Sequence, residues 1–394
     1  MLWKFSMLNP RIKVALGVAV SAAVIAAVVV ALTSGGGPPP APRPAPAPPP
    51  PAPPPTEQFG ANVGRLFNDR TYTPAQIDQQ LAALRATGAT VARADALWEA
   101  GEPTAPQGGV HHYDWSFDDS IATALAAHGL RWLPIVDYSA PWAQSLSGVD
   151  HSPPSSAADY AEYAAALAAR YGPGGSFWKE HPSLAQQPTE AYEIWNEPDN
   201  PAFWKPAPDP AAYAALYQQA RAAIDVVQPG AQVLVGGLTH PASFLEAMVR
   251  ASPPLATQLD GVAVHPYGPG PRAVLANVRA ARSALDSLGL ARVPLYVTEF
   301  GWTTAPPGAL DYLPVRLRPD YIARTLSALG HLDCGVAAAL LYAWVTPERD
   351  PTNAQDWFGI SPPAGGSSAD VAAFAEGLKA ATAPAATDAL CAGA

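Results

Sequence analysis

Cysteine is nearly absent from this chain: its 394 residues include only Cys334 and Cys391. The two positions are too far apart for a CxxC motif, which argues against a thiol-based metal or redox centre. In an exported protein they could form a disulfide that ties the C-terminal tail to the last part of the domain. Two unpaired buried thiols are the ordinary alternative, and the sequence alone does not choose between them.

Phosphate-binding glycine turns and recognisable metal or nucleophile sets are also missing. No glycine cluster of this chain lies in a phosphate-binding pattern after the first predicted strand, which disfavours a doubly wound nucleotide-binding sheet. The adjacent residues His111 and His112 would point to opposite faces of a strand, so they do not easily share one ion. No Ser-His-Asp set is visible. We therefore expect no metal ion and no other cofactor.

Charged residues are scarce, at 14%, and the balance is acidic. Residues 1–56 contribute four positive charges and no acid to a total of −10, which leaves −14 for the remainder. A body this acidic would repel a polyanion, so we do not expect nucleic acid as a partner. Hydrophobic residues make up 49%, which supports a sizeable core and argues against disorder.

The N-terminal region predicts a membrane anchor. Val14–Leu32 is an apolar run of 19 residues, and a helix of this length spans roughly 28 Å, close to the hydrocarbon thickness of a bilayer. Lys4, Arg11 and Lys13 precede the run, which predicts a cytoplasmic segment at 1–13 and an extracytoplasmic remainder in the cell membrane. A cleavable signal peptide, which would give a secreted protein, is the alternative, although its apolar region is usually shorter.

A Gly/Pro-rich linker over residues 33–56 follows the apolar run. Pro38–Pro55 contains 13 prolines in 18 residues, and proline fixes φ and removes the amide donor. We expect an extended polyproline II spacer, roughly 56 Å long at about 3.1 Å per residue. A docking site for a proline-binding module is the less favoured interpretation.

Residues 57–394 alternate short β-type runs with helical patterns. Their number is enough for one large α/β barrel domain or two smaller domains. Runs such as Val233–Val235 and Ala338–Leu341 are continuously apolar, as expected for parallel strands buried on both faces. Eight strands alternating with eight helices over about 330 residues predict a (β/α)8 TIM barrel. The expected strands are Phe59–Gly64, Thr90–Asp95, Trp132–Tyr138, Tyr192–Asn196, Gln232–Leu238, Gly261–His265, Leu295–Glu299 and Ala337–Trp344.

Helix start signals separate these strands. Thr73, Ser116 and Ser156 are the expected N-caps of the first three helices, because each is a hydroxyl residue followed by a helix-favouring first turn. Glycines at 88, 129 and 172 are expected to end them. The later helices are expected near Pro210–Val227, Ala242–Ala251, Pro271–Leu288, Pro319–Leu332 and Ala369–Ala381.

Two glutamates stand where predicted strands end. The run Glu193–Asp199 (Glu-Ile-Trp-Asn-Glu-Pro-Asp) places Glu197 after the fourth strand, and the run Tyr296–Trp302 (Tyr-Val-Thr-Glu-Phe-Gly-Trp) places Glu299 at the end of the seventh. The C-terminal ends of barrel strands meet at one mouth, so both carboxylates should share a cleft. Glycoside cleavage needs such a pair, one acid and one nucleophile or base. Ordinary charged strand ends are the alternative.

The Asn-Glu-Pro turn at 196–198, together with Thr298–Trp302, resembles the large clan of retaining (β/α)8 glycoside hydrolases (clan A), above all its cellulase-like and β-xylosidase-like families. The resemblance covers roughly residues 58–382. It implies that Glu197 is the general acid and then the base, and that Glu299 is the nucleophile, with carboxyl groups about 5–5.5 Å apart. It also implies that Asn196 holds the sugar 2-hydroxyl.

Three further residues match the clan pattern less sharply. The resemblance implies that Arg93, in the second predicted strand, bonds to Glu299; a structural ion pair with Asp95 or another acid is the alternative. In His265-Pro266-Tyr267, at the end of the sixth predicted strand, Tyr267 would donate a hydrogen bond to Glu299 and His265 would contact substrate. A satisfied core histidine is the alternative for His265.

Tryptophan is abundant, with 11 residues. Trp344 ends the eighth predicted strand, where the clan places an aromatic platform for the sugar, because the C–H faces of sugars pack on aromatic rings. Trp98, Trp142 and Trp302 fall in loops that follow predicted strands and are further candidates for substrate binding. Core packing is the alternative for each of them.

The sequence thus predicts a retaining glycoside hydrolase with an oligo- or polysaccharide substrate and a monomeric catalytic domain. A transglycosylase with the same residues and a non-catalytic carbohydrate-binding barrel remain as alternatives, and a hydrolase of another bond on this fold is less favoured. The segments 172–188 and 303–319 could each block the cleft and so decide between endo and exo action.

Overall fold

The computed structural model describes residues 58–383 and 389–391. The predicted cytoplasmic segment, membrane anchor and Pro-rich linker lie outside these residues and stay predictions. Within the described part, no helix combines the length and the apolar character that a bilayer crossing requires.

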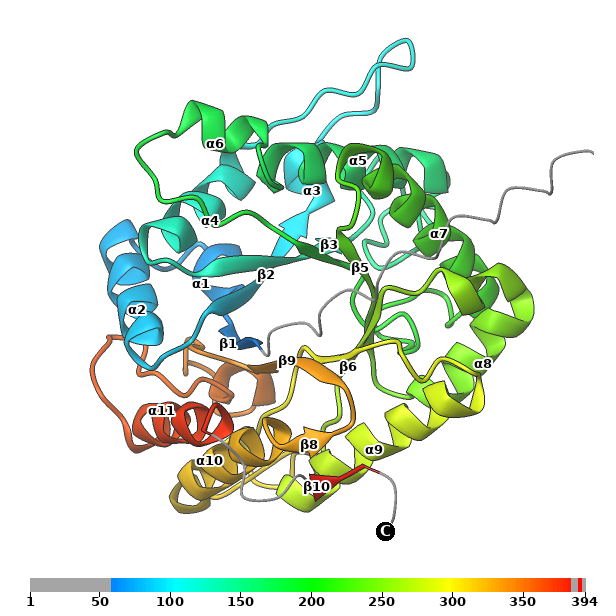
Figure 1. Cartoon of the computed structure of the whole chain (residues 1–394). Coiled ribbons are helices and arrows are strands. Elements are labelled where there is room, and N and C mark those ends of the chain that lie inside the picture. Colours follow the sequence, from blue (N-terminus) through cyan, green and yellow to red (C-terminus); the bar gives the residue numbers. More distant parts are fainter. Residues whose placement is uncertain (1–57, 384–388, 392–394) are drawn as a thin grey trace, which may run out of the picture. The chain divides into compact units, whose positions relative to one another are not determined.

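Eight parallel strands form a closed barrel whose order follows the chain (Figure 1). The first strand pairs with the second and also with the last, which closes the ring. The barrel strands are β1 (Gln58–Asn62), β2 (Val91–Leu97), β3 (Arg131–Asp137), β4 (Ala191–Ile194), β5 (Gln232–Leu238), β6 (Gly261–Val264), β7 (Leu295–Val297) and β9 (Val336–Leu341). The predicted (β/α)8 barrel and the positions of all eight strands are confirmed.

Helices surround the barrel, and in Figure 1 the last helix lies beside the first part of the ring. The longer ones are α2 (Pro74–Ala86), α4 (Ser116–Ala127), α5 (Ala157–Tyr171), α7 (Pro210–Val227), α8 (Pro241–Ala251), α9 (Pro271–Ser287), α10 (Arg318–Leu329) and α11 (Ala369–Ala381). The shorter ones are α1 (Arg65–Asn68), α3 (Trp98–Gly101), α6 (Ser176–Glu180) and the 3₁₀ turns η1 (Pro253–Thr257), η2 (Val315–Leu317) and η3 (Ala354–Trp357).

Two of the three predicted N-caps form as expected. Thr73 accepts from the amide of Gln76 in a capping box, and the Ser156 hydroxyl accepts from the amide of Asp159. The prediction for Ser116 is wrong, because Ser116 is already the first helical residue. The carboxylate of Asp114, two residues earlier, accepts from its amide instead.

The barrel interior is filled by strand side chains that point inward, including Val91, Leu133, Leu234, Tyr296 and Leu340. The larger apolar cluster lies between the strands and the helices. Side chains of a strand alternate between these two layers. The inward-pointing residues nearest the C-terminal ends of the strands therefore lie at the mouth of the barrel. These positions carry the polar residues of the candidate site.

The C-terminal tail is fastened to the barrel by a disulfide. Cys334 and Cys391 are bonded, and the short strands β8 (Leu332–Asp333) and β10 (Ala389–Leu390) pair in parallel beside them. The sequence left this pairing open, and the structure forms it. Helix α10 ends at Leu329, three residues earlier than predicted, because Leu332 belongs to β8.

Replacement of Cys391 by serine should lower the free energy of unfolding by about 2–4 kcal/mol, because the cross-link restricts a long loop in the unfolded chain. Urea denaturation of the oxidised wild type, the reduced wild type and the Cys391→Ser variant checks this. The reduced protein should match the variant. Equal stability of all three, or two free thiols in the exported protein, would contradict the bond.

Candidate active site

The C-terminal ends of the strands surround a cleft of about 670 Å³. Its lining comes from the C-terminal ends of several strands and from the loops that follow them, as is usual for functional sites of this fold. Six residues that the sequence assigned to one site come together in it: Arg93, Asn196, Glu197, His265, Tyr267 and Glu299.

The turn after β4 presents Glu197 in an uncommon backbone conformation. Trp195 has a φ of 66° and Glu197 a φ of 46°, in the left-handed region that residues other than glycine rarely adopt. The indole N–H of Trp195 donates to the Phe203 carbonyl at 2.7 Å, and the Tyr213 hydroxyl donates to the Ile194 carbonyl at 2.7 Å. These contacts maintain a strained turn, and strain of this kind is typical of functional sites.

Glu299 lies two residues after β7 and is only 8% exposed. The Tyr267 hydroxyl donates to its Oε2 at 2.7 Å, and Arg93 Nη1 donates to its Oε1 at 2.5 Å. Both contacts were expected from the sequence resemblance, and both are confirmed. The two donors fix the position of the carboxylate, and the guanidinium compensates its charge.

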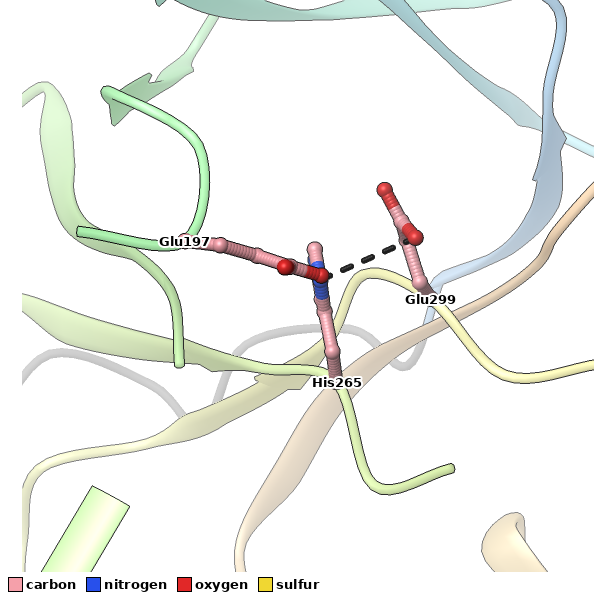
Figure 2. A group of neighbouring side chains, drawn as sticks. All are labelled: Glu197, His265 and Glu299. Carbon is pink, nitrogen blue, oxygen red and sulfur yellow. Dashed lines mark hydrogen bonds and ion pairs between the residues drawn. The ribbon is translucent and has the colours of Figure 1, made fainter. Parts of the chain in front are cut away.

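His265 lies between the two glutamates (Figure 2). Its Nδ1 is 2.8 Å from Glu197 Oε1 and 3.6 Å from Glu299 Oε2, and its Nε2 is 3.1 Å from Thr298 Oγ1. Gly237 leaves room for the ring, since a Cβ there would be 2.0 Å from Nε2. Burial lowers the pKa of His265, but Glu299 and the hydrogen bond to Glu197 raise it, and the net shift is upward.

Arg93 is buried, and all three of its nitrogens donate hydrogen bonds. Nε and Nη2 donate to the two carboxylate oxygens of Glu193 at 2.8 and 2.9 Å. Nη1 also donates to Asn62 Oδ1 at 2.7 Å, and Nη2 to Asn196 Oδ1 at 2.9 Å. The last contact engages the carbonyl side of the Asn196 amide, which leaves its NH₂ group to donate toward the cleft.

Sequence reasoning missed Glu193 and Asn62. Glu193 is fully buried in β4, where it pairs with Arg93 and also accepts the amide of Gly237 at 2.8 Å. Asn62 ends β1, and its amide donates to the Thr298 carbonyl at 2.9 Å. The available signal was a glutamate inside an apolar strand, because a buried carboxylate requires a partner.

The ion pairs of Arg93 are with Glu193 and Glu299. The alternative partner considered for it, Asp95, lies further along β2 and accepts instead from Asn68 at 2.6 Å. Arg93 thus bonds to Glu299, as the resemblance implies, and also forms the structural ion pair of the alternative, with Glu193 as the acid.

The predicted aromatic platform at Trp344 is wrong. Its indole is fully buried, donates to the Gln80 carbonyl of α2 at 3.0 Å, and lies 6.0 Å from the ring of Phe374 in α11. The side chain lies between α2 and α11 and is not part of the cleft lining. Tyr342 and Phe358 line the cleft instead, with ring centroids 5.3 Å apart.

The other three candidate tryptophans also lie outside the cleft lining. Trp98 is fully buried against Trp142 with centroids 5.3 Å apart, and both indole N–H groups donate to Glu102. Trp302 is 1% exposed and donates to the Gly268 carbonyl at 2.8 Å. These rings pack the strand-end loops, which is the alternative that the sequence left open.

The opposite wall of the cleft has an aromatic pair that the sequence did not reveal. Tyr138 and Phe203 both line the cleft, with ring centroids 6.3 Å apart and planes within 13° of parallel. Of the two segments expected to be able to block the cleft, 303–319 contributes Leu310 and Asp311 to its lining. No residue of 172–188 belongs to that lining.

One ligating atom from each of Glu197, His265 and Glu299 lies within 4.8 Å of the other two. This spacing would also suit a metal ion. However, the Arg93 guanidinium is already bonded to Glu299, and a cation beside it would be repelled. The expectation that no metal is bound stays a prediction.

Comparison with known proteins gives the fold. No protein-family model and no curated protein sequence matches the chain. Among solved structures it is similar to a GH39 β-xylosidase from Caulobacter crescentus, with a TM-score of 0.60 and 21% identity over 81% of this chain and 70% of that one.

Two other glycoside hydrolases are similar to a comparable extent. The exo-β-1,4-mannosidase Op5Man5 from Opitutaceae bacterium strain TAV5 has a TM-score of 0.58 and 20% identity, over 83% of this chain and 60% of that chain. A fungal β-1,4-galactanase has a TM-score of 0.55 and 15% identity, over 81% of this chain and 98% of that chain. The chain therefore has the (β/α)8 barrel fold that these glycoside hydrolases share, as the sequence resemblance implied.

Proposed function

We propose that this protein is a retaining glycoside hydrolase that cleaves β-linked glycans by double displacement. The observation that carries the proposal is the short distance between the two carboxylates, since an oxygen of Glu197 and an oxygen of Glu299 lie within 4.8 Å. Carboxyl groups of retaining enzymes are about 5–5.5 Å apart, whereas inverting enzymes need about 6.5–9.5 Å to place a water between them.

Each carboxylate has an environment suited to one role. Glu299, held by Arg93 and Tyr267, attacks the anomeric carbon and forms a glycosyl ester. Glu197 protonates the departing glycosidic oxygen. In the second step Glu197 takes a proton from water, the water oxygen attacks the anomeric carbon, and Glu299 leaves. Two displacements at one carbon retain its configuration.

Asn196 and His265 complete the site. The Asn196 NH₂ group, directed by the bond from Arg93 to its carbonyl oxygen, donates to the sugar 2-hydroxyl. His265 contacts the oxygen of Glu197 that faces Glu299, so it positions the acid/base carboxylate beside the nucleophile.

The names of the similar structures suggest which substrates to test first: they are a β-xylosidase, a β-mannosidase and a β-1,4-galactanase. Release of reducing ends from xylans, mannans, galactans and β-glucans by residues 57–394, with Glu299→Gln in parallel, tests the proposal. Release by the wild type alone supports it. Products longer than the substrate would indicate transglycosylation, and tight binding without turnover would indicate a binding protein.

We also propose that residues 14–32 anchor the protein in the cell membrane and that residues 33–56 hold the catalytic domain outside it. The bond between Cys334 and Cys391 supports an extracytoplasmic position, because disulfides persist in oxidising compartments.

Azide should assign the two carboxylates. Glu299→Gly and Glu197→Gly should each lose about 10²–10⁴-fold in kcat or more, and azide should restore part of the activity to both. In Glu299→Gly, azide replaces the nucleophile and gives the α-glycosyl azide. In Glu197→Gly, azide attacks the glycosyl-enzyme and gives the β-glycosyl azide. Proton NMR of the products distinguishes the two, and the same anomer from both variants would refute the assignment.

Removing the charge of Glu193 should destabilise the protein by about 3–5 kcal/mol, because it leaves the Arg93 guanidinium buried without its main partner. Glu190→Gln is the matched control: Glu190 precedes the same strand but forms an exposed ion pair with Arg131, worth at most about 1 kcal/mol. Thermal and urea unfolding of Glu193→Gln and Glu190→Gln check this. Equal stability of the two variants would show that the buried pair is dispensable.

The membrane proposal predicts that the full-length chain, when expressed in cells, is recovered in the membrane fraction with residues 1–32 retained. Fractionation followed by peptide mapping of the mature N-terminus checks this. A mature N-terminus beyond Thr33 would instead indicate a cleaved signal and a secreted enzyme.

A further inference from the structure

A polar pair in the cleft has no part in the mechanism above. Asp95 of β2 lines the cleft, and its Oδ2 accepts a hydrogen bond from Asn68 Nδ2 of α1 at 2.6 Å. Because side chains alternate along a strand, Asp95 lies on the same inward face as Arg93 and about 7 Å nearer the mouth. The carboxylate therefore stands above the guanidinium that holds Glu299.

The backbone is shaped around this pair. A Cβ at Gly64 would lie 2.5 Å from Asp95 Oδ2 and 3.5 Å from Asn68 Nδ2, so glycine at this position leaves the carboxylate its place. Burial raises the pKa of Asp95, Asn68 and Arg93 lower it, and Glu299 raises it. The net shift of the pKa of Asp95 is upward. The hydrogen bond from the Asn68 amide uses only part of the acceptor capacity of the Asp95 carboxylate.

This position matches the ring hydroxyls of the sugar bound on the nucleophile side. The anomeric carbon must lie between Glu197 and Glu299, and the proposed partner of the 2-hydroxyl is Asn196. Asn196 is hydrogen-bonded to Arg93 of β2. A sugar whose 2-hydroxyl lies at Asn196 would therefore extend its ring toward β2. The next hydroxyls around the ring, at carbons 3 and 4, are then those that reach the Asp95 carboxylate above Arg93.

The charges of the cleft favour a neutral sugar. Among the described residues, its lining has four acidic side chains, two arginines, two histidines and no lysine. Both arginines are already engaged: Arg65 is bonded to Asp69 and Asp356, and Arg93 is bonded to two glutamates. A uronate or sulfate group would therefore meet acidic side chains without an unpaired arginine, which is costly in a partly buried site.

We propose that Asp95, held in place by Asn68, binds the 3- or 4-hydroxyl of the glycone sugar and restricts the enzyme to neutral glycans. The inference rests on the proposed glycosidase function. It adds to that function a residue that determines specificity and a class of substrate.

Substrates that lack single hydroxyl groups test the contact. The 4-nitrophenyl β-glycoside that the wild type cleaves fastest, chosen from the glucoside, xyloside, galactoside and mannoside, is compared with its 3-deoxy and 4-deoxy analogues. One deletion should lower kcat/KM of the wild type by about 10–100-fold, as expected for a hydrogen bond to a charged group. In Asp95→Ala the same deletion should have almost no effect, because its partner is gone.

Matched variants separate binding from folding. Asp95→Asn keeps the size of the side chain. Asn68→Ala should lower kcat/KM less than Asp95→Ala does, and the deoxy substrate should still be cleaved more slowly than its parent glycoside (the deoxy penalty). Asp225→Asn, on the exposed face of α7, is the surface control and should behave as the wild type. If Asp95→Ala does not fold, Asp95→Asn must show the reduced penalty.

The charge argument predicts that 4-nitrophenyl β-glucuronide is cleaved at least 100-fold more slowly than the best neutral glycoside, and comparable rates would refute the restriction to neutral glycans. If the wild type cleaves glycosides but both deoxy penalties persist unchanged in the Asp95 variants, Asp95 does not contact the sugar and this inference alone fails. If the wild type cleaves none of the glycosides and none of the glycans of the panel, the proposed function itself fails.

Discussion

The buried guanidinium of Arg93 is the interaction on which the rest of the site depends. Its five hydrogen bonds reach Asn62 on β1, Glu193 on β4, and Asn196 and Glu299 in the turns after β4 and β7. Together these bonds connect residues of β1, β4 and the turns after β4 and β7 to β2. A charge this deeply buried is tolerated only when its donors are satisfied, so the four partners and the strand register that aligns them are required together.

The remaining constraints act on Glu197. Glu197 lies in a turn with two left-handed residues, and the turn persists because Trp195 and Tyr213 hold it from the helix side. His265 then sets the side chain of Glu197, and its ring fits only because residue 237 has no side chain. Both carboxylates are therefore positioned by groups that the barrel buries.

Much of the fold and of the carboxylate pair could be predicted because their signals are local. A buried parallel strand is an apolar run, and Glu197 and Glu299 come three and two residues after the ends of β4 and β7. The platform at Trp344 could not be predicted correctly, because the direction of a side chain beyond a strand end depends on where the chain turns. Ser116 failed as an N-cap for a similar reason, since Asp114 offers a competing acceptor two residues earlier.

The buried polar layer also bears on whether this barrel is catalytic. A protein that only binds glycans needs polar and aromatic groups along its cleft, and Tyr138, Phe203 and Asp95 would suffice for that. It has no use for a fully buried ion pair such as Arg93–Glu193, whose desolvation is unfavourable and which apolar residues of similar size could replace with equal or greater stability. The strained turn at Glu197 adds a further cost to the folded state. Both features become understandable if two carboxylates must be held within bonding reach of one carbon atom, which is a requirement of catalysis and not of binding.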